Sequence, residues 1–187
     1  MLLLLTFLLA AAQLRLGEPV PEIPVSDTER SRISLSAFTG KQPVLILASC
    51  ARQTIRQASG AAVLRLEMPD PALGRAVLLV DKQGVLRRIE RFPGVEPAPA
   101  DLVRIIERWL AGKSSFETAC ARCHGDDGSS TDYPFIKKLT GIGNRLTEDQ
   151  IRDRLHPLPM RSEQYSVRSH LFRSDELSAL IAYVAGL

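Results

Sequence analysis

The sequence predicts an α+β chain of two domains, an α/β domain over residues 13–112 followed by an all-α domain over residues 113–187. Short runs rich in Val and Leu, typical of buried strands, occupy the first half of the chain. From residue 100 onward, apolar residues recur at i, i+3, i+4 and i+7, the spacing of one helix face. With 187 residues, 45% of them apolar, the chain is long enough to build two small cores.

An apolar segment, residues 1–12, opens the chain and is interrupted only by Thr6. It is shorter than the roughly 20 residues that a helix needs to cross a bilayer. Ala10, Ala11 and Ala12 supply the small residues that signal peptidase requires. We therefore expect a cleaved signal peptide and an exported, periplasmic protein. The alternatives are an uncleaved segment that tethers the protein, and a buried strand or helix of the mature fold.

Three apolar runs predict the strands of the α/β domain, at residues 44–47, 62–64 and 76–80. Residues 81–84, Asp-Lys-Gln-Gly, predict a turn whose glycine adopts the left-handed conformation. Residues 85–89 then form the partner strand of a hairpin.

A helix from residue 100 is predicted to close this domain, and we expect Gly112 to end it. Its apolar face consists of Leu102, Ile105, Ile106 and Trp109. The change from strand runs to a helix completes an α/β segment.

Capping signals predict three helices in the all-α domain. Ser114 and Glu117 form a capping box for the first helix, and Thr147 and Gln150 form one for the second. Ser174, with Asp175 and Glu176 in the first turn, is expected to start the third.

The charge pattern excludes nucleic acid as the expected partner. The formal net charge is only +3, and no run of Lys and Arg is interleaved with aromatic residues. No pattern in the chain identifies a small-molecule substrate either.

Three cysteines are present, an odd number that cannot form a complete disulfide framework. Two of them lie in the sequence CARCH at residues 120–124. Cys120, Cys123 and His124 at i, i+3 and i+4 place two thiols and an imidazole on one helix face. This spacing is what covalent attachment of one c-type haem requires, so we expect haem c as the cofactor.

Two alternatives to a haem site stay open. A redox disulfide between the two cysteines, or a zinc site completed by His156 or His170, would use the same pattern. If the cofactor is haem, Met160 is the leading candidate for the sixth iron ligand, because two prolines stiffen the approach to it. His156, His170 or an open position are the rivals.

Four stretches of the all-α domain match one family: Phe116–Gly125, Gly141–Leu146, Pro159–Met160 and Asp175–Val184. On these motifs, residues 113–187 resemble a class I cytochrome c domain. The resemblance implies that His124 is the proximal iron ligand and Met160 the distal one. The stretch between Met160 and Ser174 is longer than in the family and is rich in Arg and Ser.

The same resemblance assigns supporting roles to three further residues. It implies that Phe116 and Tyr183 pack together where the first and last helices cross. It also implies that the carbonyl of Pro134 accepts a hydrogen bond from the second ring nitrogen of the proximal histidine.

Four stretches of the α/β domain match a second family: Gly17–Pro21, Leu35–Lys41, Pro43–Cys50 and Arg75–Val85. Residues 18–112 resemble a degenerate member of the thioredoxin superfamily, closest to peroxiredoxins. The resemblance makes Cys50 the thiol position and Arg75 the active-site arginine. Leu47 stands where peroxiredoxins have Thr, and Gln53 stands where a second Cys would lie. We therefore expect an inactive domain in which Cys50 is a small buried residue.

The function favoured by these features is an exported monohaem c-type cytochrome, an electron-transfer protein rather than an enzyme. It would carry one electron at a time between exported or membrane redox proteins, with the iron between His124 and Met160 and the first domain as a scaffold or docking module. One alternative is a haem-linked thiol oxidoreductase or peroxidase that uses Cys50 and Arg75. Another is a haem-based sensor with a labile sixth ligand.

Overall fold

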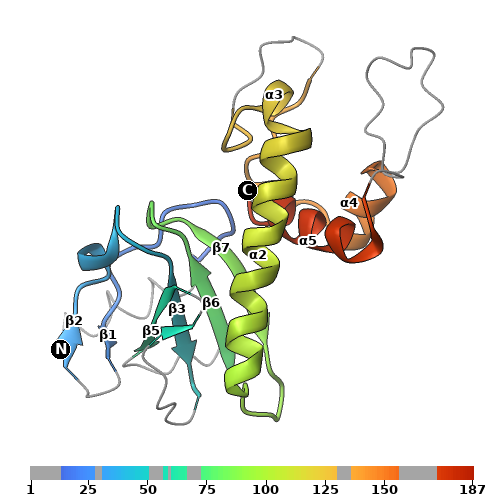
Figure 1. Cartoon of the computed structure of the whole chain (residues 1–187). Coiled ribbons are helices and arrows are strands. Elements are labelled where there is room, and N and C mark those ends of the chain that lie inside the picture. The colour runs from blue at the N-terminus through green and yellow to red at the C-terminus, as the bar shows by residue number, and fades with distance from the viewer. Residues whose placement is uncertain are drawn as a thin grey trace, which may run out of the picture. The chain divides into compact units, whose positions relative to one another are not determined.

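The structure, a computed structural model, describes residues 14–27, 31–50, 57–58, 60–66, 73–129, 136–155 and 172–187. The chain divides into two compact units, and the division lies between Glu107 and Arg108. This division falls within helix α2 (Pro99–Ala119), near the domain boundary expected after residue 112 (Figure 1). The two units are described separately below.

Several sequence-based predictions lie outside the described residues. They are the signal segment 1–12, the hydrogen-bonding role of Pro134, and the candidate ligands His156, Met160 and His170. Among the helices within the described ranges, none is both long and apolar enough to cross a membrane.

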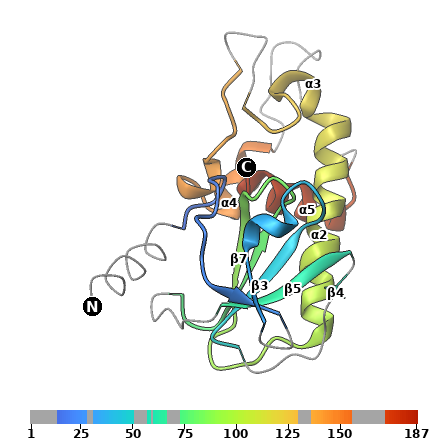
Figure 2. The same cartoon turned by 90° about the vertical axis from the view of Figure 1, so that its left-hand side faces the viewer.

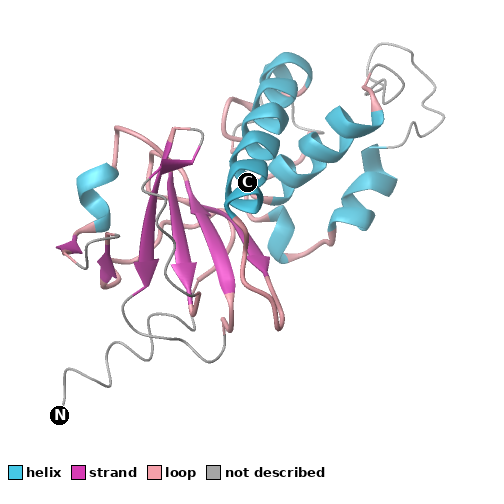
Figure 3. Ribbon diagram, turned by 60° about the horizontal axis from the view of Figure 1, so that its bottom comes forward, coloured by secondary structure: helices cyan, strands magenta, loops and turns pink. Residues whose placement is uncertain are grey.

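The first unit contains a mixed sheet with the strand order β2-β1-β5-β3-β6-β7, and β4 pairs with β5. Figure 3 shows these strands in magenta. Their bounds are β1 Val25–Ser26, β2 Arg32–Ile33, β3 Val44–Ala48, β4 Gln57–Ala58, β5 Ala61–Leu66, β6 Ala76–Val80 and β7 Leu86–Arg91. A short 3-10 helix, η1, spans Leu35–Phe38.

The central strands have the arrangement of the thioredoxin fold, which confirms the predicted fold class of this unit. Strand β3 pairs in parallel with β5, with Val44 opposite Ala62. Strand β6 pairs antiparallel with the other side of β3, and β7 continues from β6 as a hairpin partner. Helix α2 follows, and its first half lies alongside the sheet (Figure 2).

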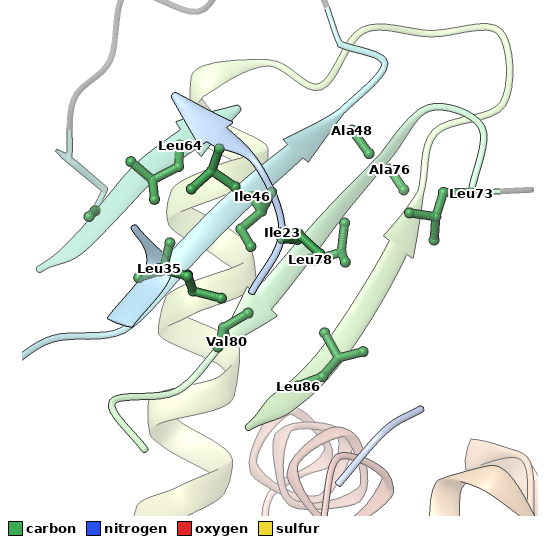
Figure 4. Packing of buried hydrophobic residues seen from close by; sticks show 13 residues of the cluster. Ile23, Leu35, Ile46, Ala48, Leu64, Leu73, Ala76, Leu78, Val80 and Leu86 are labelled. Atoms are coloured by element: carbon green, nitrogen blue, oxygen red, sulfur yellow. The ribbon is translucent and has the colours of Figure 1, made fainter. Parts of the chain in front are cut away.

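Both faces of the sheet are buried, which explains the continuous apolar runs in its central strands. Ile46, Leu78 and Leu86 belong to a core cluster on one face, shown as sticks in Figure 4. Residues that alternate with them, such as Leu45 and Leu79, are equally buried and point to the opposite face. Helix α2 lies behind the sheet on that side. Three of its predicted core residues are buried there: Leu102, Ile105 and Ile106.

The predicted hairpin turn is confirmed and is built around a buried aspartate. Gly84 has φ +81°, the left-handed conformation that the turn requires. The Asp81 side chain is only 3% exposed, and its Oδ1 accepts hydrogen bonds from the backbone N–H groups of Gln83 and Val85. Its Oδ2 accepts a hydrogen bond from Arg87 Nε at 2.7 Å. One carboxylate therefore closes the turn and neutralises a nearly buried guanidinium.

Replacing Asp81 by Ala is expected to lower the free energy of unfolding by about 3 kcal/mol, because the change leaves the Arg87 charge and two backbone donors without this acceptor. Urea denaturation followed by circular dichroism measures the loss. Glu90→Gln is the matched control, since Glu90 pairs with Arg88 on the same hairpin but both side chains are more exposed. The control should lose less than about 1 kcal/mol, and equal losses in the two variants would contradict the assigned role of Asp81.

The second unit is helical in its described part, as predicted. It contains the second half of α2, then α3 (Ala121–His124), the 3-10 helix η2 (Ile142–Asn144), α4 (Glu148–Leu155) and α5 (Ser174–Ala185). Helices α4 and α5 contact each other, and α5 also contacts η2.

The structure describes the starts of α4 and α5, both of which were predicted from the sequence. At α4, the Thr147 N–H donates to Gln150 Oε1 at 2.9 Å, and the Gln150 N–H donates to Thr147 Oγ1 at 3.2 Å. This confirms the capping box. At α5, the cap is Arg173, whose N–H donates to a Glu176 carboxylate oxygen at 2.9 Å. Ser174 is therefore the first residue of the helix, as predicted, and Asp175 and Glu176 lie in its first turn.

Helix α2 runs through Gly112 without a break, so the prediction that Gly112 ends a helix is wrong. The predicted new start at Ser114 and Glu117 is wrong for the same reason. A Cβ atom at Gly112 would lie 2.1 Å from the carbonyl oxygen of Ala179 and 2.7 Å from Tyr183 Cβ. Glycine is needed here because α2 and α5 cross at very short range.

Candidate functional site

The CARCH motif forms one helical turn at the junction of α2 and α3. The Cys120 N–H donates to the carbonyl of Phe116 at 2.8 Å, continuing the hydrogen-bond pattern of α2. The Cys123 and His124 N–H groups both donate to the Cys120 carbonyl, at 3.1 and 3.0 Å. Gly125 follows with φ +74° and ends the turn. The predicted i, i+3, i+4 geometry of the two thiols and the imidazole is therefore present.

The two thiols differ in their exposure to solvent. Cys120 is buried and Cys123 is half-buried, and no disulfide joins them. Burial, followed by the neighbouring Cys123, raises the pKa of Cys120 to about 11. Cys120 therefore keeps its proton at neutral pH, and the motif presents free sulfur atoms.

The imidazole of His124 is held by a backbone carbonyl. Its Nδ1 lies 3.1 Å from the carbonyl oxygen of Lys137, which can accept a hydrogen bond from a protonated Nδ1. That tautomer leaves the Nε2 lone pair available for a metal ion. Burial lowers the pKa of His124, and the Lys137 carbonyl acts in the opposite direction. The net effect favours the neutral imidazole, the form that binds metals.

The residue beside Nδ1 was not found by sequence reasoning. Pro134, to which the cytochrome resemblance assigned this hydrogen bond, lies outside the described residues. The described carbonyl in contact with His124 belongs to Lys137. A backbone acceptor leaves no mark in residue types, so no pattern in the sequence could identify it.

Aromatic rings pack beside the motif at the crossing of α2 and α5. The Phe116 and Tyr183 ring centroids are 5.3 Å apart, which confirms the expected helix crossing at these two residues. Trp109 packs against the same Tyr183 ring at 5.9 Å. Contacts of this kind stabilise beyond the area that they bury. These ring contacts connect α2, one helical turn before Cys120, to helix α5.

Gly143 and Arg108 make further contacts between the helices of the second unit. A Cβ atom at Gly143 would lie 1.9 Å from the carbonyl oxygen of Ala185, so η2 contacts the end of α5 directly. Arg108 Nη2 lies 3.4 Å from a Glu148 carboxylate oxygen and donates to the Ser178 carbonyl at 3.2 Å, linking α2, α4 and α5. Sequence reasoning missed Arg108, because its partners lie 40 and 70 residues away.

The side chains present fit haem c better than a metal ion bound by protein ligands alone. Within the described ranges, no group of three or more His, Cys, Asp and Glu side chains could hold a metal ion. A zinc site would need a residue such as His156 or His170, which lie outside those ranges. A haem needs from this turn only two sulfur atoms for its vinyl carbons and one nitrogen for its iron, and the turn supplies all three.

The structure also describes Cys50 and Arg75, to which the peroxiredoxin resemblance assigned the thiol and the active-site arginine. Cys50 follows β3 and is 5% exposed, and Arg75 precedes β6. Arg75 Nε lies 2.9 Å from Glu96 Oε1. Gln53 lies outside the described residues, and Leu47, where a peroxiredoxin has Thr, is buried.

The fold and the site define the second unit as a c-type haem-binding domain. Residues 110–187 match the cytochrome c family, and this region is a cytochrome c domain. Membership implies a covalently bound haem c and a role as an electron carrier. The chain is also similar to the crystal structure of reduced 2-Cys peroxiredoxin from Plasmodium vivax, with 13% identity, 53% of this chain and 83% of that chain covered, and a TM-score of 0.37. No curated protein matches the chain.

Proposed function

We propose that the chain is an exported monohaem c-type cytochrome that carries one electron at a time. One haem c is attached through Cys120 and Cys123, and His124 binds the iron. The observation that carries this proposal is the single helical turn holding both thiols and an imidazole whose Nδ1 faces the Lys137 carbonyl. A neutral imidazole oriented in this way presents Nε2 as the donor atom.

The residues of this chain divide the work at the site. The two cysteine sulfurs would hold the haem covalently, and His124 would supply a nitrogen to its iron. The haem, when bound, supplies an iron that gains or loses one electron without a change in covalent bonds. The Lys137 carbonyl keeps His124 oriented and makes it a stronger donor. The buried Phe116 packs against Tyr183 one helical turn before Cys120.

Denaturing extraction tests covalent attachment. Protein matured in a host that attaches haem should keep its colour after acid and organic solvent, and its mass should exceed that of the apoprotein by one haem. Cys123→Ser should weaken attachment, and Cys50→Ser is the matched control, which should leave it unchanged. A redox titration should then fit a single one-electron transition. Colour that leaves with the solvent would reject the proposal.

The sixth ligand is proposed to be Met160, with a thioether sulfur on the iron. Met160→Ala should lower the reduction potential and abolish the weak sulfur-to-iron band at the red end of the oxidised spectrum. The matched controls, His156→Ala and His170→Ala, should change neither property. If a histidine variant does so and Met160→Ala does not, the assignment is wrong.

Export and partners belong to the same proposal. The apolar segment 1–12 supports export, and a one-electron carrier needs a donor and an acceptor in its own compartment. We infer that these partners are exported or membrane redox proteins. Cell fractionation of the full chain, with and without residues 1–12, tests the location, and haem-containing protein that stays in the cytoplasm would contradict it.

A further inference from the structure

A cluster of four side chains surrounds the end of strand β3 in the first unit. It consists of Cys50, Arg65 on β5, Arg75 before β6, and Glu96 in the loop after β7. The Cys50 thiol donates to the Ala48 carbonyl at 3.2 Å and lies 3.6 Å from the Ala76 carbonyl. The Ala48 carbonyl favours the thiol, because a thiolate has no hydrogen to donate to it.

Both guanidinium groups near the thiol have other partners. Arg65 Nη2 donates to the backbone carbonyl of Cys50 at 2.8 Å, not to its sulfur. Arg75, the residue that matches the active-site arginine of peroxiredoxins, forms an ion pair with Glu96 at 2.9 Å. A cation activates a cysteine by stabilising its thiolate. A carboxylate that pairs with that cation opposes this stabilisation.

We propose that Glu96 keeps Cys50 unreactive by holding the Arg75 guanidinium in an ion pair, so that Glu96 controls the thiol chemistry of the first unit. This inference does not depend on the haem. The ion pair between Arg75 and Glu96 lies within the thioredoxin-like unit, and it would give a physical cause for low reactivity of the Cys50 thiol.

The pKa of Cys50 is shifted in the direction that the proposal requires. Burial and, after it, the Glu96 carboxylate raise the pKa of Cys50 to about 11, while Arg75, a backbone hydrogen bond with Ala76, and Arg65 act in the opposite direction. A raised pKa means that the thiol keeps its proton at neutral pH and ionises only in strong alkali. At pH 8 the thiolate fraction would be about one in a thousand, against roughly one in four for a free cysteine with a pKa near 8.5.

Alkylation of Cys50 by iodoacetamide tests the proposal. The thiolate sulfur displaces iodide, so the rate at a fixed pH follows the thiolate fraction. Full-length protein is alkylated between pH 6 and pH 10.5, and the Cys50 peptide is quantified by mass spectrometry, which keeps the readout independent of the haem. Glu96→Gln should react at least about threefold faster than the parent at pH 8, equivalent to a pKa lower by half a unit. Glu90→Gln, which loses a different carboxylate of the same sheet, should react at the parent rate.

A double variant tests whether Glu96 acts on Cys50 through Arg75. If Glu96 acts through Arg75, the gain should vanish in Arg75→Gln/Glu96→Gln, compared with Arg75→Gln alone. Glu96→Gln reacting at the parent rate would overturn the proposal. A gain that persists in the double variant would also overturn it, because Glu96 would then act on Cys50 directly or through opening of the structure, and not through Arg75.

Discussion

Replacement of both Cys120 and Cys123 by Ala is expected to leave the second unit unfolded while the first unit stays folded. The second unit is a small helical segment, and small domains without a cofactor in the core are only marginally stable. The first unit has its own sheet and its own buried cluster. The expected result is a large loss of helical circular dichroism with retention of strand signal.

Trp109 reports on the second unit alone, since it is the single Trp of the chain and packs against Tyr183. Eleven residues of helix separate it from Cys120, about 16 Å along the axis, within range of quenching by a haem. The parent and the control Cys50→Ser should show weak emission. The double alanine variant should show strong emission shifted to the red by exposure. Emission that stays weak or blue would mean that the unit folds without haem.

Gly112→Ala is expected to destabilise the protein by roughly 3 kcal/mol, although helix propensity alone predicts a gain of about 1 kcal/mol. The added Cβ would lie 2.1 Å from the Ala179 carbonyl oxygen, and a backbone atom cannot move aside without shifting α5. The clash lowers the free energy of unfolding and the helix propensity of Ala raises it. The sign of the measured change therefore shows which of the two effects is larger. Urea denaturation of the haem-loaded protein, followed by Trp109 emission, measures it.

Ala111→Gly is the matched control for this prediction. Residue 111 is exposed on the same helix. Its replacement should cost about 1 kcal/mol through propensity only. If Gly112→Ala stabilises the protein instead, the crossing of α2 and α5 is looser than the structure describes.

Local signals in the sequence were sufficient for much of the fold. The Val- and Leu-rich runs predicted β3 and β6, because strands buried on both faces need apolar residues at every position. The Asp81–Gly84 turn and the capping box of Thr147 and Gln150 were also predicted correctly. Each depends on residues within four positions of one another, so the chain carries the whole interaction in one short stretch.

The CARCH motif could be predicted from the sequence alone, because Cys120, Cys123 and His124 need only one helical turn to meet. The tertiary structure alone decided the role of Gly112, since a glycine at a helix end and a glycine at a helix crossing look the same in the sequence. It also decided which carbonyl faces His124 and which carboxylate holds Arg75. Those contacts join residues that are 13 and 21 positions apart, and only the folded backbone brings such residues within hydrogen-bond distance.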